Sequence, residues 1–226
     1  MWQTILGILV TAVLAALLAR KLYLGRQKQQ LAPFAFFKDS AACLERAEIS
    51  PGEAAGTMLL NGYFNGQPVQ VKAITDTLAL RKLPSLWLMV TLPGELPLTA
   101  AFDLMMRPAG PTTFSNFDHL PATLATPADF PANAVIRSDD PSKAIPNHVV
   151  APHLQPFFET SAKELLITPK GLRMVVLLAQ ADRARYGVFR QAEFGDYTLD
   201  PGQLEVIIKR LQALRTDIIT WAGNVA

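Results

Sequence analysis

The longest uninterrupted hydrophobic stretch of the chain lies near its N-terminus. Residues 2–19 contain no charged side chain, and a helix of this length spans roughly 27 Å, nearly the thickness of the hydrocarbon layer of a bilayer. The long side chains of Arg20 and Lys21 can reach lipid headgroups, so the helix can continue to residue 24. The pattern predicts a transmembrane anchor over residues 1–24, a juxtamembrane linker over 25–33 and one globular domain over 34–226.

A cleaved signal peptide is the main alternative for this segment. Signal peptides begin with basic residues and carry small residues just before the cleavage site. Residues 1–4 contain no basic side chain, and a cut after Ala19 would place Leu17 where a small residue is expected. We therefore favour a permanent anchor.

Basic residues follow the predicted span and none precedes it. Arg20, Lys21, Arg26 and Lys28 lie just after the hydrophobic run, and positive charge marks the cytoplasmic side of a membrane segment. The domain is therefore expected on the cytoplasmic side, with these four cations near lipid headgroups. A bacterial inner membrane fits this arrangement. A mitochondrial inner membrane remains open, because the first acidic residue of the chain is Asp39.

Small residues recur at every fourth position of the predicted anchor. Gly7, Thr11, Ala15 and Ala19 would lie on one helix face, which allows a second helix to approach closely. The face indicates pairing with another membrane protein or with a second copy of the chain. The alternative is that such residues are simply common in membrane helices.

Alternating and continuous hydrophobic runs predict strands in the first half of the domain. Residues 57–76 form a hairpin pattern around Asn65-Gly66, a pair that suits a two-residue turn. Residues 86–92 are apolar throughout and residues 98–106 follow a Pro-Gly turn. We expect residues 56–106 to form an antiparallel meander of about four strands.

Proline punctuates the middle of the chain. Nine of the seventeen prolines fall in residues 107–156, where they disfavour helices and central strands. We expect an extended connection there, with a short strand at 134–137 and short helices within 141–160. A second hairpin is predicted over residues 164–178, with its turn at 169–171.

The clearest helix signal comes at the end of the chain. Asp200 suits the N-cap, Pro201 the first helical position and Gly223 the C-terminal stop. Apolar residues at spacings of three and four form one seam, expected to pack on the domain's own sheet: Leu204, Ile207, Leu211, Leu214, Ile218 and Trp221. A shorter helix is expected over residues 40–47. The fold class is therefore α+β, an antiparallel sheet built from hairpins and packed by a long C-terminal helix.

Charge argues against nucleic acid as a partner. The formal net charge of +2 includes the four cations beside the anchor, whereas residues 29–226 hold 17 basic and 19 acidic side chains, 17 − 19 = −2. Binding to a phosphate backbone requires a basic surface. A small cluster of Arg183, Arg185 and Arg190 could receive an acidic partner or lipid headgroups, or could simply be a solvated face.

The sequence contains few residues that could form a catalytic or metal-binding site. Asp139, Asp140, His148 and His153 are the densest gathering of metal-ligand residue types. The two histidines are five residues apart, whereas a helical zinc pair is separated by four, and the aspartates before a proline are explained by turn formation. The single cysteine, Cys43, is expected to be a buried apolar residue.

These observations favour a single-pass membrane-anchored, non-catalytic accessory or scaffold protein of a membrane complex, without a cofactor. Two alternatives stay open. One is a membrane-bound hydrolase that uses the Asp139, Asp140, His148 and His153 set, and the other is a module that binds a lipid or another small ligand.

Overall fold

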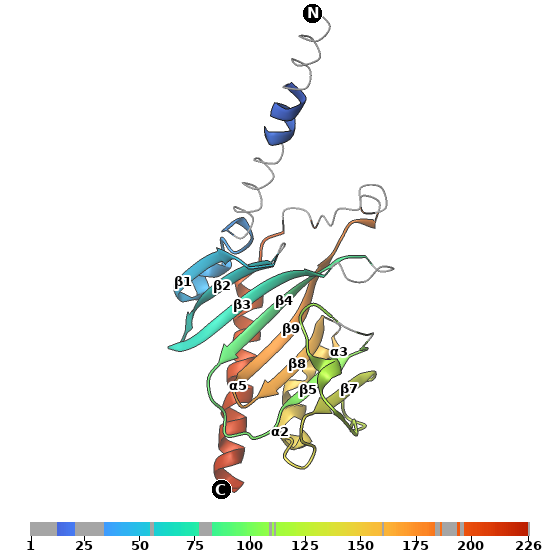
Figure 1. Cartoon of the computed structure of the whole chain (residues 1–226). Helices are drawn as coiled ribbons and strands as arrows, with labels where there is room; N and C mark the ends of the chain where they lie inside the picture. The colour runs from blue at the N-terminus through green and yellow to red at the C-terminus, as the bar shows by residue number, and fades with distance from the viewer. Residues whose placement is uncertain are drawn as a thin grey trace, which may run out of the picture.

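The domain is built on one mixed α+β scaffold, a single antiparallel sheet with the long C-terminal helix across one face (Figure 1). The computed structural model describes residues 13–20, 34–54, 57–76, 83–108, 110, 112–159, 161–183, 186, 194 and 197–225. The sheet has nine strands in the order β1-β2-β3-β4-β9-β8-β5-β7-β6. These strands are β1 (Glu45–Pro51), β2 (Thr57–Phe64), β3 (Gln67–Asp76), β4 (Ser85–Pro93), β5 (Phe102–Met106), β6 (Ala122–Leu124), β7 (Ala134–Ser138), β8 (Ala162–Thr168) and β9 (Gly171–Gln180).

Both predicted hairpins are confirmed. β2 pairs with β3 in continuous register, and Asn65 and Gly66 between them have φ angles of 51° and 73°, as a type I′ turn requires. β8 and β9 form the second hairpin, and Gly171 at its turn has φ 142°. The predicted strand at 134–137 is also present, as β7.

The expected four-strand meander is wrong in its last strand. β4 pairs with β3 as expected, but its other neighbour is β9. The fourth strand, β5, lies between β8 and β7. The second hairpin therefore inserts between two strands that are close in sequence. β4 and β5 are joined by a loop across the end of the sheet instead of a hairpin turn.

The predicted helix over residues 40–47 is also wrong in part. A single turn of 3-10 helix, η1 (Ser40–Cys43), is followed at once by the edge strand β1. Strand β1 is held by pairing with β2, so a long-range partner overrides the local helical preference. Gly62 permits this contact, because a Cβ there would lie 2.9 Å from Cβ of Leu44.

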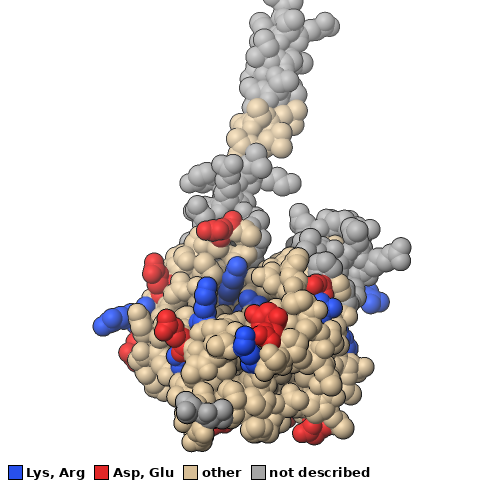
Figure 2. All heavy atoms as spheres, turned by 60° about the horizontal axis from the view of Figure 1, so that its bottom comes forward, with Lys and Arg blue, Asp and Glu red and all other residues tan. Residues whose placement is uncertain are grey.

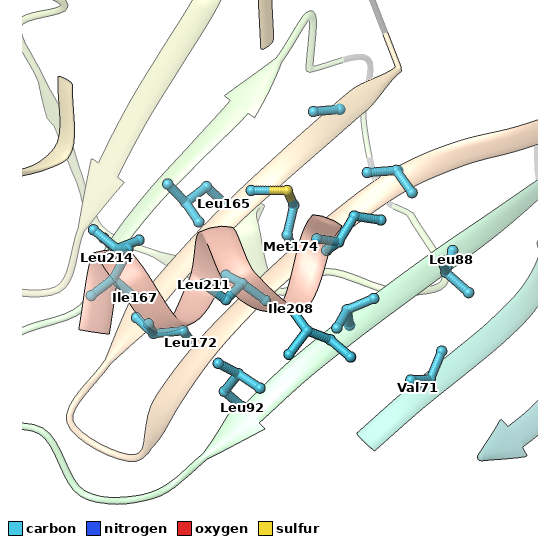
Figure 3. Close-up of a cluster of buried hydrophobic side chains, with 14 of the residues drawn as sticks. Val71, Leu88, Leu92, Leu165, Ile167, Leu172, Met174, Ile208, Leu211 and Leu214 are labelled. Atoms are coloured by element: carbon cyan, nitrogen blue, oxygen red, sulfur yellow. The ribbon is translucent and has the colours of Figure 1, made fainter. Parts of the chain in front are cut away.

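One face of the sheet, called the inner face here, carries the main hydrophobic core. The long helix α5 (Pro201–Val225) packs across it, and Figure 3 shows its side chains Ile208, Leu211 and Leu214 against the strands. Five of the six residues of the predicted seam are buried, and Trp221 at its end is half-buried. Each fully buried aliphatic side chain contributes about 1.5–3 kcal/mol, so this face is the main source of the domain's stability.

Only the beginning of α5 lies where the sequence predicted it. Oδ1 of Asp200 accepts the backbone N–H of Gln203 at 2.7 Å, which confirms the N-cap. Gly223 does not stop the helix, which continues to Val225. The short helices expected within 141–160 are present and cover the inner face beside α5: α2 (Asn147–Val150), η3 (Ala151–His153) and α3 (Gln155–Phe158).

Candidate functional site

Two acidic side chains are buried on the opposite, outer face of the sheet. Asp103 of β5 is 1% exposed and Glu164 of the neighbouring strand β8 is 0% exposed. Asp103 stands between Phe102 and Leu104, which point to the inner core, whereas Glu164 stands between Lys163 and the core residue Leu165. Their side chains also form a hydrogen bond with each other. Carboxyl groups almost never occupy such positions without partners, so this pair is the centre of the candidate site.

Arg173 and Ser115 complete the contacts of Glu164. Nη2 of Arg173, on β9, lies 3.2 Å from Oε2 of Glu164. The hydroxyl of Ser115 donates to the other carboxylate oxygen and accepts the backbone N–H of Phe117 at 3.0 Å. The Glu164 carboxylate thus connects the sheet to the segment that contains Ser115, which crosses over the outer face.

Burial changes the acidity of the pair. It raises the pKa of Asp103 to about 8, chiefly through loss of solvation and next through the nearby charge of Glu164, while Arg173 opposes the shift. Burial also raises the pKa of Glu164, against the lowering effects of Arg173 and Ser115. Two adjacent carboxyl groups with one guanidinium between them therefore hold a proton at neutral pH, and Asp103 carries it.

The segment above the pair, residues 112–120, is called the strap here. Its Phe114 and Phe117 are buried on the outer face, where they form a second, smaller apolar cluster with residues of the sheet: Ile74, Met89, Met105 and Val175. Phe114 also packs against the ring of Trp87. The strap is therefore attached both by apolar packing and through Ser115.

Arg137 of β7 fastens the far end of the strap. Its Nη1 lies within hydrogen-bond distance of three strap carbonyl oxygens, those of Phe117, Asp118 and Leu120, at 3.4, 3.1 and 3.3 Å. Its guanidinium also stands 5.1 Å from the centre of the Phe117 ring, a cation–π contact. Arg137 is in addition the direct cross-strand neighbour of Asp103.

The covered part of the outer face has unmet hydrogen-bonding capacity. In the described part of the chain, five buried side-chain atoms lack a hydrogen-bond partner: Nε1 of Trp87, Oδ1 of Asp103, Oγ1 of Thr112, Nε of Arg137 and Nε of Arg173. All five belong to the strap or to outward-facing residues of the strands. Unmet groups of this kind are uncommon in folded proteins, and on this face they gather around the strap.

The register places the site within a longer polar row. Side chains directly opposite each other in an antiparallel sheet share a face, and one such row crosses β2 to β7. From β2 to β7 the row consists of Asn61, Gln70, Thr91, Arg173, Leu166, Asp103 and Arg137. Leu166 is its one apolar member. The outer face thus carries this polar row, whereas the inner face is mainly apolar.

The described part of the N-terminal helix, residues 13–20, has no contact that would bury its apolar side chains. Residues 13–20 are helical, and all eight are exposed. The large aliphatic side chains Val13, Leu14, Leu17 and Leu18 are 54–61% exposed. No helix within the described residues is both long and apolar enough to cross a membrane. Most of the predicted span, residues 2–12 and 21–24, lies outside the described part.

The proposed metal ligands are each engaged separately. Oδ1 of Asp139 accepts the backbone N–H of Ala101 at 2.8 Å, Asp140 binds Ser142 and Lys143, and His153 lies 2.8 Å from Asp217. His148 is exposed. Across the residues with a described placement, no three His, Cys, Asp or Glu side chains are grouped closely enough to hold a metal ion.

The remaining predicted surfaces are described only in part. Ala15, Ala19 and Arg20 are exposed on the N-terminal helix, whereas Gly7, Thr11, Lys21, Arg26 and Lys28 lie outside the described residues. Arg183 is exposed, and Arg185 and Arg190 are likewise not described. Figure 2 shows acidic and basic side chains interspersed on the face that it presents. Cys43 is half-buried, with Sγ 3.6 Å from the carbonyl oxygen of Pro201.

Comparison with known proteins assigns the chain to no family. No protein-family model matches the chain, and no curated protein matches it. Among solved structures, the chain is similar to the crystal structure of the mycobacterial trehalose monomycolate transport factor A, TtfA. The two are 9% identical over 78% of this chain and 75% of that chain, with a TM-score of 0.39. So remote a likeness says nothing about function, which must be argued from this chain's own residues.

Proposed function

We propose that the chain is a single-pass membrane-anchored, non-catalytic accessory protein whose domain lies on the cytoplasmic side and supports a membrane complex. The observation that carries the proposal is the exposed apolar helix of residues 13–20. Four large aliphatic side chains there are more than half exposed. Transfer of each from water to an apolar environment is worth about 1.5–3 kcal/mol.

Water is a poor solvent for such a helix. Residues 13–20 are all exposed, so their apolar side chains gain nothing from packing on the domain, and packing is the main source of helix stability in folded proteins. A bilayer supplies both the apolar surroundings and the requirement that backbone groups bond within the segment. The uncharged run from residue 2 to residue 19 gives the helix the length that spanning needs.

The buried site supports a structural role over a catalytic one. Ser115, Arg137, Glu164 and Arg173 are occupied in fastening the strap and in balancing one another's charge. Catalysis would require at least one of them to face a substrate, but the rings of Phe114 and Phe117 cover this part of the sheet. The separate partners of Asp139, Asp140 and His153 give the hydrolase alternative no geometric support.

A second candidate function, binding of a lipid or another small ligand, is favoured by one observation. Three of the unpartnered buried atoms are N–H donors, on Trp87, Arg137 and Arg173, beside an apolar cluster. A ligand that combines an oxygen acceptor with an apolar part would satisfy them. Full-length protein titrated with decanoate and, separately, with decane tests this: stabilisation by decanoate alone supports the site, and no effect of either removes it.

The main proposal is tested by membrane fractionation and affinity capture in mild detergent. Substitution of Leu14 and Leu17 by Lys places two charges in the exposed helix and is expected to move the protein from the membrane pellet to the soluble fraction. The matched control is Val206→Lys with Ile219→Lys, which charges two exposed apolar positions of α5 instead. The control protein should remain in the membrane with its partners.

Two results would count against the proposal. If both variant proteins fractionate alike, the N-terminal helix is not the anchor. If the wild-type protein is extracted as a monomer that captures no other membrane protein, an accessory role is wrong even though the anchor is real.

A further inference from the structure

The charges around the buried pair do not balance when both carboxyl groups are ionised. Asp103 and Glu164 together would carry two negative charges, and Arg173 is paired with Glu164. Two further cations lie on neighbouring strands. Lys163 of β8 binds the carbonyl oxygens of Met106 and Arg107, and Nη1 of Arg137 on β7 is engaged by the strap carbonyls. A desolvated, unbalanced carboxylate is costly. Hence Asp103 keeps its proton, and burial raises its pKa to about 8.

Arg137 has two possible partners. It is directly opposite Asp103 in the register of β5 and β7, where Cα atoms lie about 4.5–5.5 Å apart. With Asp103 neutral, the guanidinium binds the carbonyl oxygens of Phe117, Asp118 and Leu120. With Asp103 ionised, a full negative charge competes with those neutral acceptors, and a carboxylate can accept two parallel N–H bonds from a guanidinium.

The strap is also attached to the Asp103–Glu164 pair through the hydroxyl of Ser115. Ser115 donates its hydroxyl to Glu164 and so shares that carboxylate with Arg173 and Asp103. Loss of the Asp103 proton removes a donor from the group and draws Arg173 and Arg137 toward the new charge. The attachment through Arg137 is therefore weakened by this event, and the hydroxyl of Ser115 is left as the one polar side-chain contact described between the strap and the sheet.

We propose that the Asp103–Glu164 pair is a proton-controlled latch: when Asp103 gives its proton to water, Arg137 transfers from the strap to Asp103, and residues 112–120 lift from the sheet. Lifting exposes the apolar cluster around Met89, Met105 and Val175. The inference goes beyond the proposed anchoring role and does not depend on it.

The groups that face Asp103 are drawn from each element packed around it. β8 contributes Glu164, β9 contributes Arg173 and β7 contributes Arg137, while the strap contributes the hydroxyl of Ser115. The titratable groups of the strap itself, Asp118 and His119, are exposed. The latch therefore responds to one buried acid and not to the strap's own charges.

Hydrogen–deuterium exchange of the full-length protein in detergent tests the latch. The reporters are the backbone amides of Phe117, His119 and Leu120, which are hydrogen-bonded within the closed strap. After correction for base catalysis, their exchange should rise at least tenfold between pH 7 and pH 9.5, because a group with a pKa of about 8 passes from mostly protonated to mostly ionised. Amides of the β2–β3 hairpin report global unfolding and should change much less.

Two variants separate the latch from a general effect of pH. Asp103→Asn cannot ionise and should keep the strap closed across the whole range. Asp118→Asn removes an exposed acid of the strap and should behave like the wild-type protein. Should Asp103→Asn fail to fold, the wild-type series still decides, and Arg137→Gln should open the strap already at pH 7.

Equal exchange of the strap amides at pH 7 and pH 9.5 in the wild-type protein would overturn the proposal. So would a tenfold rise that persists in Asp103→Asn, because another group would then control the strap. A parallel rise in the β2–β3 hairpin would show that the whole domain opens and would likewise overturn the latch.

Discussion

Glu164 and Arg173 are nine residues apart in the chain, and their side chains meet across the β8–β9 hairpin at 3.2 Å, the carboxylate wholly buried and the guanidinium side chain 20% exposed. The two ends of this ion pair thus lie in different environments. The carboxylate depends on its partner, whereas the guanidinium is in partial contact with water. Substituting Arg173 and substituting Glu164 should therefore change the free energy of unfolding by different amounts.

Arg173→Met should destabilise the domain by about 3 kcal/mol, since a buried carboxylate that loses its partner is left uncompensated. Chemical denaturation of the full-length protein in detergent measures the change. Lys209→Met is the control: the pair of Lys209 with Glu205 is well exposed, so its loss should cost less than about 1 kcal/mol. Equal costs in the two variants would mean that Glu164 is neutral in the folded protein.

Stability should fall as pH rises from about 4 to about 8 because of Asp103. Its folded pKa is about 8 against an ordinary value of 3.8, so the folded state binds the proton more tightly. The contribution is fully present below pH 3.8 and is lost as pH rises through 8, at up to about 1.4 kcal/mol per pH unit. The difference between wild type and Asp103→Asn in denaturation series isolates this group.

Asp140 provides a control of opposite sign. Lys143 and Ser142 lower its pKa to about 2, so any stability that it contributes is present above pH 3.8 and is lost as pH falls through 2. Asp140→Asn should therefore leave the slope between pH 4 and pH 8 unchanged. A slope altered by Asp140→Asn and not by Asp103→Asn would contradict the assignment of the proton to the buried pair.

The N-cap of α5 should be worth about 1 kcal/mol. Asp200→Ala removes the acceptor for the backbone N–H of Gln203, whereas Asp200→Asn keeps an oxygen in the same place. Thermal denaturation should show a lower Tm for the alanine variant and little change for the asparagine variant. Equal losses would indicate that the carboxylate acts through its charge and not as a cap.

Helix pairing in the membrane depends on the small-residue face. Ala15→Leu places a large side chain on that face and should reduce association in the bilayer, measured by energy transfer between labelled copies or by capture of the native partner. Ala16→Leu makes the same change one position further along the helix and should have a smaller effect. Equal effects would show that the helix associates through another face, or not at all.

Local signals in the sequence were sufficient for the turns, the hairpins and the start of α5. Asn65-Gly66 and Asp200-Pro201 dictate backbone conformation through neighbouring residues alone. The position of β5 was not foreseeable in this way, because its partners in β7 and β8 follow 28 to 65 residues later, from the pair Met106–Ala134 to the pair Phe102–Ile167. Residues 45–47 likewise became strand through pairing with β2.

The buried pair was missed, although the sequence holds a signal for it. Asp103 and Arg173 each interrupt an apolar run, and Glu164 directly precedes the apolar residues 165–167. The hairpin register predicted from the turn at 169–171 places Arg173 beside Leu166 and diagonal to Glu164. That would have suggested one ion pair. The second acid required the non-local pairing of β5 with β8, which no local pattern encodes.

The insertion of the β8–β9 hairpin between β4 and β5 bears on how the chain is made. β4 ends at Pro93 and its second neighbour, β9, begins at Gly171, so a ribosome adds about 80 residues, over roughly 4–16 s, before that strand edge can be paired. During this interval the nascent chain presents an apolar edge of the type that promotes aggregation. The second edge of β4 therefore stays without its native partner until β9 has been synthesised.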